Sequence, residues 1–441
     1  MHKVISEKTN GLVGTLKIPG DKSISHRALI LGSVARGTTE INGLLESEDV
    51  LNTAKALQKL GTLIRKTDEG LWIVQSNRPF KQPDSVIDMG NSGTGVRLLM
   101  GVLAAYPIRV ELTGDASLRS RPMKRITDPL SETGAVFETT NGKLPIVMQG
   151  YADDRAFSYT MPVASAQLKS ALLLAGLRKK QTTTVYEPVA CRDHTERMLK
   201  AFGADITVKK NNDNVNVITL RGGNTLKACS VFVPADISSA AFAIVAALIT
   251  GNSDITVENV GLNPLRTGIL DVLLKMGADI RFENKREIAG EPVADLRVRS
   301  SSLKGIDVPA ETAPSMIDEY PILAIAAAFA DGKTVLRGLS ELKVKESDRF
   351  RAIIDGLNKN GIECGEIGDD SLQIRGIGKK PCGGGLIESK LDHRIAMSFM
   401  VMGMASENPV CIDDISSVAT SFPEFISLMN KAGANIHDYC D

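Results

Sequence analysis

The chain contains 441 residues, which is enough for two or three domains with substantial cores. Lysine plus arginine equals aspartate plus glutamate, at 52 each, so the formal net charge is zero and bulk basicity does not favour nucleic acid or an acidic membrane surface as a partner. Any selectivity for anions must therefore come from local clusters of charge.

The sequence carries no targeting or cofactor signature. Its first residues, MHKVISEKTN, lack the apolar core of a secretory signal, and no apolar run approaches the roughly 18 residues of a membrane-spanning helix. The six cysteines are scattered, without a Cys-x-x-Cys pair and without histidines at metal-ligand spacing. These features predict a cytoplasmic protein with structural thiols and with neither a metal nor another cofactor.

The predicted elements repeat six times along the chain. Each copy contains a long, mostly apolar helix that leads through a turn into a β-branched strand. Such segments occur at residues 25–41, 94–112, 165–187, 238–258, 318–338 and 392–413. Because these helices are apolar on most faces, we expect them to be buried.

An amphipathic helix that ends in glycine and runs into another strand accompanies each apolar helix. The glycines are spaced 69–84 residues apart, at Gly61, Gly134, Gly203, Gly277, Gly361 and Gly433. Glycine is favoured just after a helix because it adopts positive φ without a steric penalty. One such match could arise by chance, whereas six at near-equal spacing indicate a repeat. The sequence therefore predicts an α/β (α+β) protein of two similar domains, each built from three repeats.

Charged residues cluster where these helices are predicted to begin. Five cations fall in predicted first turns: Lys22, Arg121, Arg192, Lys345 and Arg349. A cation is disfavoured there because the helix dipole already presents positive charge, so the pattern indicates that an anion binds among them. The fourth copy begins DISSAAFAI, without a basic residue, which suggests that the fold itself does not require these charges. For any single arginine, the alternative is a solvated surface charge.

Two short motifs sharpen this hypothesis. Ser23 and Arg27 are four residues apart on one helix face, with Lys22 just before them, so the three can converge on one phosphate or carboxylate. The turn GNSGTG at residues 90–95 fits neither common nucleotide-binding motif, but its glycines allow a ligand to approach the backbone closely.

Acidic residues are fewer and lie beside the cations. They are Asp318, Glu319, Glu346 and Asp348. A carboxylate among cations can act as a base, or can relay a proton if its pKa is tuned. For Glu346 and Asp348, a local ion pair is an equally good interpretation. The residues alone thus predict a site that binds one or two small polyanions, needs no metal and transfers protons.

Eight segments, in chain order, resemble the 5-enolpyruvylshikimate-3-phosphate (EPSP) synthase family. They are GDKSISHR, GNSGTGVRLL, RPMKR, PVASAQLKSALLLAG, RDHTERML, APSMIDEYPILA, VKESDR and LDHRIAMSF. The resemblance covers nearly the whole chain and looks closest to the bacterial glyphosate-tolerant class. It implies two domains of three βαβαββ repeats packed around buried parallel helices, an inside-out barrel-like arrangement. Residues 21–230 would form one domain and residues 1–20 plus 231–441 the other, with the active site in the cleft between them.

The resemblance also implies an activity in chorismate and aromatic amino-acid biosynthesis. The enolpyruvyl group of phosphoenolpyruvate would pass to the 5-hydroxyl of shikimate 3-phosphate, through a tetrahedral intermediate from which phosphate leaves. The protein would act as a monomer, its partners would be these two substrates, and glyphosate would be a possible inhibitor.

Roles carry over by position in the matching motifs. The residues implied to hold shikimate 3-phosphate are Lys22, Ser23, Arg27, Ser165, Ala166, Gln167, Arg192, Asp318 and Lys345. Those implied to hold phosphoenolpyruvate are Lys22, Gly93, Arg121, Gln167, Arg349 and Arg394. Asp318 would be the base on the 5-hydroxyl, and Glu346, helped by Lys22, would protonate the methylene carbon.

Two positions depart from the family pattern. Many members carry a lysine in a KTFP segment near the C-terminus. This chain has Ser421 in the corresponding segment TSFPEF, so it lacks that cation, as the tolerant group does. The tolerant group carries an alanine where this chain has Gly93. Because the alanine methyl narrows the site against glyphosate, we expect this protein to be more sensitive to glyphosate than the tolerant group.

Three alternatives stay open on the sequence alone. A UDP-N-acetylglucosamine enolpyruvyl transferase shares the fold, but the position of its reactive cysteine is Ala116 here. A catalytically inactive polyanion-binding protein on this scaffold would have lost an acid or an arginine of the site, and none is lost. An RNA-terminal phosphate cyclase has a related repeat, but zero net charge without a basic stripe disfavours RNA.

Overall fold

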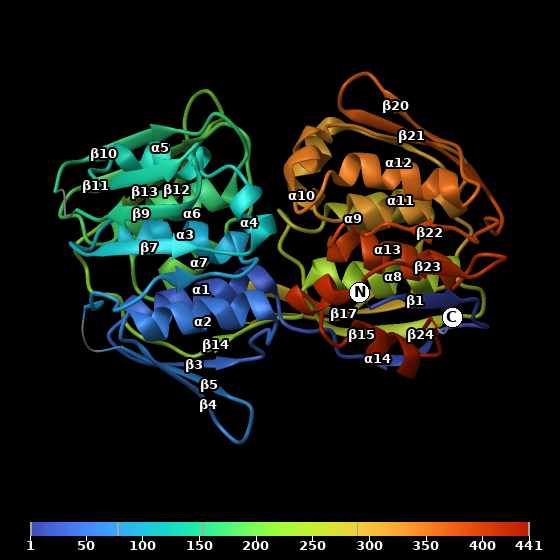
Figure 1. Ribbon diagram of the computed structural model, residues 1–441, viewed down its shortest axis with the longest axis horizontal. Helices are drawn as coiled ribbons and strands as arrows, with labels where there is room; N and C mark the ends of the chain where they lie inside the picture. The colour runs from blue at the N-terminus through green and yellow to red at the C-terminus, as the bar shows by residue number, and fades with distance from the viewer. Residues whose placement is uncertain (1, 77–78, 152–153, 289, 440–441) are drawn as a thin grey trace. The chain divides into compact units, whose positions relative to one another are not determined.

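The computed structural model describes residues 2–76, 79–151, 154–288 and 290–439. Its internal contacts divide the chain into two units, coloured blue to green and green to red along the chain in Figure 1. The first, here the 20–233 unit, is one continuous segment; the second, here the 234–441 unit, also includes residues 1–19. The boundary after residue 233, rather than the predicted 230, arises because β14 (Val231–Phe232) pairs with a strand of the 20–233 unit.

The strands of the described residues form six four-stranded sheets, three in each unit, and all six have the same internal order. In each sheet the first strand is parallel to the second, and the second, third and fourth are successively antiparallel. This regularity confirms the mixed α/β class and the six-fold repeat that the spaced glycines predict.

In the 20–233 unit, the sheets are β14–β3 (Gly37–Asn42)–β5 (Trp72–Ser76)–β4 (Leu63–Lys66), β6 (Ile87–Asp88)–β7 (Arg109–Thr113)–β9 (Lys143–Gln149)–β8 (Val136–Thr140), and β10 (Phe157–Thr160)–β11 (Thr182–Glu187)–β13 (Asn216–Arg221)–β12 (Asp205–Lys210). Its helices are α1 (Lys22–Val34), α2 (Glu48–Lys59), α3 (Gly93–Leu103), α4 (Ala116–Ser120), α5 (Lys124–Ser131), α6 (Ala166–Gly176) and α7 (His194–Ala201).

In the 234–441 unit, the sheets are β2 (Val13–Leu16)–β15 (Asp254–Gly261)–β17 (Glu291–Arg299)–β16 (Asp279–Ile288), β18 (Asp307–Val308)–β19 (Asp331–Leu336)–β21 (Ser371–Ile377)–β20 (Cys364–Ile367), and β22 (Leu386–Ile387)–β23 (Val410–Ile412)–β1 (Val4–Glu7)–β24 (Asn435–Asp438). Its α-helices are α8 (Ile237–Ile249), α9 (Gly268–Lys275), α10 (Ala313–Met316), α11 (Tyr320–Phe329), α12 (Arg349–Lys359), α13 (His393–Gly403) and α14 (Phe425–Lys431). Its 3₁₀ turns are η1 (Ala310–Thr312), η2 (Ser340–Val344) and η3 (Ser416–Thr420).

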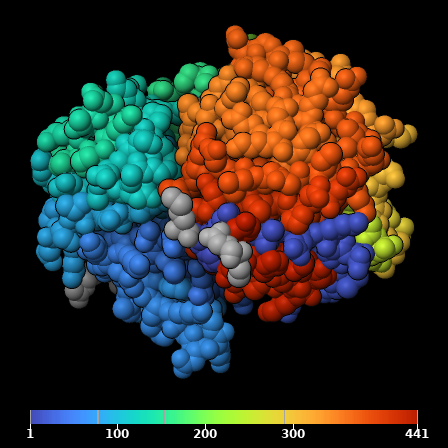
Figure 2. Space-filling view, turned by 45° about the vertical axis from the view of Figure 1, so that its right-hand side comes forward, coloured from blue at the N-terminus to red at the C-terminus, as the bar shows by residue number. Residues whose placement is uncertain are grey.

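The N-terminal residues belong to the 234–441 unit. Strand β1 lies between β23 and β24, with Val4 opposite both Ile412 and Asp438, and β2 lies parallel to β15. Figure 2 shows these violet-blue N-terminal residues on the surface beside the red C-terminal ones. Two strands from the start of the chain thus complete sheets whose other strands come from its second half.

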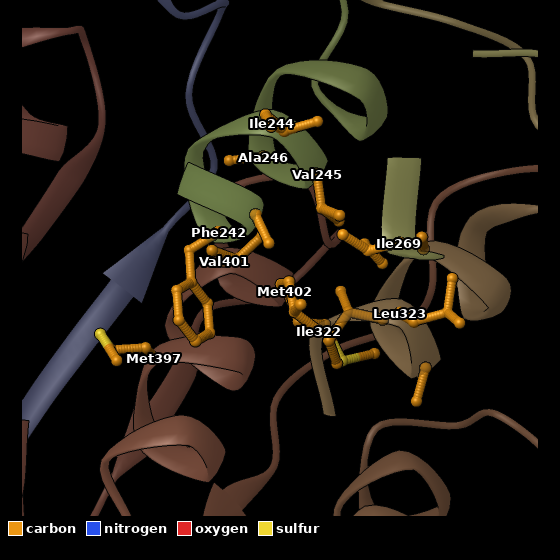
Figure 3. Close-up of a cluster of buried hydrophobic side chains, with 14 of the residues drawn as sticks. Phe242, Ile244, Val245, Ala246, Ile269, Ile322, Leu323, Met397, Val401 and Met402 are labelled. Carbon is orange, nitrogen blue, oxygen red and sulfur yellow. The ribbon is translucent and has the colours of Figure 1, made fainter. Parts of the chain in front are cut away.

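The six apolar helices are the buried centres of the two units, as predicted. Almost every residue of α8, α11 and α13 is buried, and the same holds for α1, α3 and α6 in the other unit. Figure 3 shows Phe242 and Val245 of α8, Leu323 of α11 and Met402 of α13 in one apolar cluster. This packing lets the first turns of the three helices meet within each unit.

The six repeat glycines end their helices in the predicted left-handed conformation. Their φ values lie between 80° and 114°. Each donates its N–H to the carbonyl three residues earlier, as Gly61 does to Gln58 (2.9 Å) and Gly361 to Asn358 (3.1 Å). These bonds satisfy carbonyls that the helix end would otherwise leave without a donor.

Within the described residues, no helix combines the length and the apolar character that crossing a membrane requires.

Candidate active site

In the 20–233 unit, polar side chains gather at the first turns of α1, α3 and α6. Gln167, in the first turn of α6, donates from Nε2 to Thr94 Oγ1 of α3 (2.9 Å) and accepts from Arg97 Nη1 (3.0 Å). The first turns of α3 and α6 are therefore neighbours, and the backbone N–H groups and positive dipole ends of both helices lie close together.

Arg27 is fixed beside this cluster by hydroxyl groups. Its guanidinium is buried and donates from Nε to Thr195 Oγ1 (2.6 Å), from Nη2 to Ser170 Oγ (2.7 Å) and from Nη1 to the Ser23 carbonyl (2.9 Å). Ser170 and Thr195 also share a hydrogen bond (2.6 Å), which links α6 to α7. The predicted pair Ser23 and Arg27 thus lies on one face of α1, against α6 and α7.

Lys22 begins α1, directly after the N-cap Asp21, whose side chain accepts from Ile24 N (2.8 Å). Its ammonium forms an ion pair with the buried carboxylate of Asp49 at the start of α2. His26 is buried on the same helix and its Nδ1 lies 2.9 Å from Thr53 Oγ1. Burial and then the nearby Lys22 hold the pKa of His26 well below its ordinary value, so this histidine is neutral and structural.

Gly93 and Arg121 lie next to each other at the start of α3. A methyl group on Gly93 would stand 2.9 Å from Arg121 Nη1 and 3.1 Å from Arg97 Nη1. The Arg121 side chain is buried and donates from Nη2 to Asn91 Oδ1 (2.5 Å) and Ser117 Oγ (3.2 Å). The backbone of Gly93 and the guanidinium of Arg121 therefore form one surface beside Gln167.

Three further predicted residues lie at or just before helix starts in this unit. Ser165 is the N-cap of α6, where its Oγ accepts from Leu168 N (3.4 Å), and Ala166 is the first residue of that helix. Arg192 lies in the segment between β11 and α7, two residues before His194 begins the helix.

In the 234–441 unit, Arg349 holds three carboxylates together. The guanidinium is buried and donates from Nε to Asp392 (2.8 Å), from Nη2 to Glu346 (2.5 Å) and from Nη1 to Asp318 (3.5 Å). Lys345 Nζ lies 3.2 Å from the same Asp318 oxygen. Burial alone would lower the pKa of Arg349, but Asp392 and the two other carboxylates outweigh it and raise that pKa above its ordinary value.

Arg394 completes this cluster from the first turn of α13. It donates from Nη1 to the backbone carbonyl of Asp318 (3.0 Å), and the same atom lies 3.8 Å from the buried carboxylate of Glu319. Glu319 is the N-cap residue of α11 and accepts a hydrogen bond from Ser238 in the first turn of α8. The first turns of α8, α11 and α13 therefore meet around Glu319.

Two predictions about charges at helix starts are wrong. Arg121, Arg192 and Lys345 precede their helices instead of lying in first turns; Arg121, for example, is extended (φ −77°, ψ 143°) just before Pro122. The start of α8 is not without a cation either, because the buried Arg266 donates from Nη2 to Ser238 Oγ (2.7 Å) and Asp236 Oδ1 (3.1 Å). The sequence DISSAAFAI receives its arginine from the segment before α9, so it does not show that the charge is dispensable.

Comparisons with known proteins identify the family. The family model for EPSP synthase (3-phosphoshikimate 1-carboxyvinyltransferase) matches residues 6–429. The chain belongs to the EPSP synthase family. It is 54% identical over 435 residues to a 3-phosphoshikimate 1-carboxyvinyltransferase of Bradyrhizobium diazoefficiens, covering 98% of this chain and 92% of that one. It is 52% identical over 438 residues to that of a Chelativorans species, covering 98% and 97%.

Solved structures agree with this assignment to the EPSP synthase family. An EPSP synthase from Acinetobacter baumannii matches with a TM-score of 0.87 and 44% identity, covering all of both chains. The enolpyruvyl transferase NikO from Streptomyces tendae matches with a TM-score of 0.78 at 17% identity, which shows a shared fold alone. Members of the EPSP synthase family are transferases of the shikimate pathway, and a UDP-N-acetylglucosamine enolpyruvyl transferase is not favoured.

Sequence reasoning missed the residues that hold the predicted site in place. They are Asp49 beside Lys22, Ser170 and Thr195 beside Arg27, Asn91 beside Arg121, and Asp392 beside Arg349. Asp392 is the N-cap of α13, and its place in the quoted motif LDHR was the available signal.

Proposed function

We propose that this protein transfers the enolpyruvyl group of phosphoenolpyruvate to the 5-hydroxyl of shikimate 3-phosphate and releases phosphate, acting as a monomer. Membership of the EPSP synthase family supports the substrates. The observation that carries the chemistry is the Arg349 cluster, where Asp318 lies against Lys345 and Glu346 is a separate carboxylate on the same guanidinium. Addition requires one group that takes a proton from oxygen and another that delivers a proton to carbon.

Shikimate 3-phosphate is assigned to Lys22, Ser23, Arg27, Ser165, Ala166, Gln167 and Arg192 of one unit, with Asp318 and Lys345 of the other. Its phosphate is a dianion that suits a guanidinium fixed in advance, and three hydrogen bonds fix Arg27. The first turns of α1 and α6 supply backbone N–H groups to the same ligand.

Phosphoenolpyruvate is assigned to Lys22, Gly93, Arg121, Gln167, Arg349 and Arg394. Negative charge grows on the leaving phosphate during elimination, and arginines already held in place stabilise it without reorganising. Asp318 takes the proton of the 5-hydroxyl, because two cations next to it keep it ionised. Glu346, with Lys22, delivers the proton to the methylene carbon.

A coupled phosphate-release assay tests the proposal. The purified protein receives phosphoenolpyruvate together with either shikimate 3-phosphate or UDP-N-acetylglucosamine. Phosphate release is expected when the acceptor is shikimate 3-phosphate, and not when it is UDP-N-acetylglucosamine. Release with the nucleotide sugar, or with neither acceptor, would contradict the proposal.

The role of Glu346 has a separate test in deuterated water. If Glu346 delivers the proton, Glu346→Gln slows deuterium incorporation into the product methylene by about 100-fold, within the usual contribution of a general acid. Incorporation at the wild-type rate would assign that proton to another group.

We further propose a sensitivity to glyphosate greater than that of the tolerant bacterial group, whose alanine is Gly93 here. The proposal is supported by the short approach between a methyl at this position and the Arg121 guanidinium.

The assignment of substrate ligands given above also requires residues of both units to reach the same ligand. Small-angle scattering with and without shikimate 3-phosphate tests whether binding draws the units together; an unchanged radius of gyration would count against it.

A further inference from the structure

A buried ionic cluster lies in the 20–233 unit behind the predicted phosphate-binding residues, and no step of the proposed reaction uses it. It consists of Lys169 on α6, Glu187 at the end of β11, Glu196 on α7 and Cys191 between them. All four are buried, and Lys169 has a relative exposure of 0%. A lysine is almost never fully buried unless it is paired, and this one is paired with both glutamates.

The Lys169 ammonium has a partner for each of its three N–H donors. It donates to Glu187 Oε1 (2.6 Å) and to the Cys191 carbonyl (3.1 Å), and its Nζ lies 2.7 Å from Glu196 Oε1. Burial alone would lower the pKa of Lys169, but Glu196 and its neighbours outweigh it and raise that pKa, so the ammonium stays charged. The Lys169 side chain thus connects α6 to the end of β11 and to α7, the two elements that flank the segment 188–193.

The segment 188–193 is fixed at Cys191. Glu187 Oε1 accepts from the Cys191 N–H (3.1 Å) and from its thiol (3.0 Å), while the Cys191 carbonyl accepts from Lys169. Burial raises the pKa of this thiol to about 12, so it remains a donor at neutral pH. Both backbone groups of the residue before Arg192 are therefore occupied by the cluster.

The cluster also runs beside the groups that hold Arg27. Lys169 and Ser170 are neighbours on α6, and Glu196 and Thr195 are neighbours on α7. Lys169 and Glu196 join the two helices through an ion pair. Ser170 and Thr195 join them through a hydrogen bond between the hydroxyls that accept from Arg27. A change in the distance between α6 and α7 would move both hydroxyl acceptors of the Arg27 guanidinium, Ser170 and Thr195.

We propose that Lys169 is a positioning residue for shikimate 3-phosphate, which fixes Arg192 through Cys191 and Arg27 through the α6–α7 contact. The inference rests on the proposed function, since it takes these two arginines as ligands of that substrate. Lys169 itself is buried, and its three N–H donors are occupied within the cluster, so its effect is on the substrate's binding site and not on the reacting atoms.

The test measures binding of shikimate 3-phosphate to Lys169→Met by calorimetry, and KM for each substrate by phosphate release. We expect Kd and KM for shikimate 3-phosphate to rise about 10- to 100-fold, as a small misplacement of binding groups does. We expect KM for phosphoenolpyruvate to stay within about two-fold, because Arg121 is bonded to Asn91 and Ser117, and Arg349 and Arg394 belong to the other unit. Equal changes for both substrates, or none, would overturn the proposal.

A second variant covers the case in which Lys169→Met fails to fold, since it leaves two carboxylates buried without their cation. The triple variant Lys169→Met, Glu187→Gln, Glu196→Gln removes all three charges at nearly constant volume. It also lacks the bond to the Cys191 carbonyl, so its Kd for shikimate 3-phosphate should still rise about ten-fold or more. A folded triple variant with wild-type affinity would refute the positioning role.

Ile218→Ala is the matched control for stability. Ile218 is fully buried in β13, which pairs with β11, and it makes no polar contact with the cluster. It should lower the unfolding temperature without changing Kd for shikimate 3-phosphate, and a rise in Kd there would overturn the proposal by showing that any destabilisation suffices. Lack of turnover or binding by the wild-type protein would instead refute the proposed function.

Discussion

Replacing Gly93 by alanine should make the protein resistant to glyphosate. Gly93 begins α3, with a φ that alanine also adopts, so the backbone needs no change. The added methyl would stand 2.9 Å from Arg121 Nη1 and 3.1 Å from Arg97 Nη1, both shorter than an ordinary contact. Arg121 cannot yield freely, because it is buried and bonded to Asn91 and Ser117.

The size of the effect follows from this crowding. Inserting one methyl group into a packed site typically costs about 1–3 kcal/mol, which is about 5- to 150-fold in a binding constant. Glyphosate has one more atom than phosphoenolpyruvate between its carboxylate carbon and its phosphorus, so the longer ligand loses more. We expect the inhibition constant of glyphosate to rise about 10- to 100-fold. KM for phosphoenolpyruvate should also rise, but by a factor several-fold smaller than the rise in that inhibition constant.

Steady-state kinetics at varied phosphoenolpyruvate, with and without glyphosate, measure both constants. KM for shikimate 3-phosphate is the internal control, because Gly93 is not assigned to that substrate. Gly251→Ala is the matched substitution, since a methyl there meets no atom within 4 Å. An unchanged inhibition constant in Gly93→Ala would refute the reasoning, as would an equal change in Gly251→Ala.

Three further predictions concern both units. Arg349→Lys keeps the charge but cannot bond three carboxylates at once, so kcat/KM for phosphoenolpyruvate in steady-state kinetics should fall about 10- to 100-fold. A value within about two-fold of the wild type would contradict this prediction. Hydrogen bonds from Arg297 lower the pKa of Asp254 to about 2 in the folded protein. The contribution of Asp254 to stability is therefore fully present above about pH 4, the pKa of an unfolded aspartate, and is lost as pH falls to the folded-state pKa of about 2. The unfolding temperatures of wild type and Asp254→Asn should therefore differ at pH 7 and converge near pH 2, and a gap independent of pH would contradict this. Gly101→Ala would place a methyl 2.5 Å from the backbone of Ala171, where α3 packs on α6. The substitution should lower the free energy of unfolding, measured by denaturant titration, by at least about 1–3 kcal/mol. An unchanged free energy of unfolding would show that the two helices separate easily.

The repeat was predictable because its signals are local. A glycine such as Gly61 or Gly433 is favoured because the backbone at that position has a positive φ. This preference does not depend on contacts with distant parts of the chain. The apolar helices were equally readable, since a segment such as 238–249 has almost no polar side chain to present to water.

The completion of the sheets was not predictable from the repeat pattern, because it depends on partners far away in sequence. Strand β14 has two residues, too few to show any alternation, and pairs Val231 with Ile41. Strand β1 is central in its sheet, yet its neighbours lie near the opposite end of the chain. Only the resemblance to a known family assigned the first residues to the second domain.

The helix starts were misplaced where a local rule was overlooked. Arg121 precedes Pro122, and a residue before proline is disfavoured in the helical conformation, so that arginine could have been placed outside the helix. Arg266 is different: no local signal indicates that it reaches Asp236 and Ser238, because that contact exists only once α8 and the segment before α9 have packed.

Lys169 lies between these two cases. A lysine in the apolar run AQLKSALLLAG cannot be exposed if the whole helix is buried, so the sequence already requires a buried carboxylate partner. It does not say which one, and two glutamates, Glu187 and Glu196, share the task. Buried charge is costly, and apolar residues of similar volume often stabilise such a position as well or better. The presence of a lysine with two carboxylates next to the groups that hold Arg27 and the segment before Arg192 is therefore better explained by the placement of those arginines than by stability.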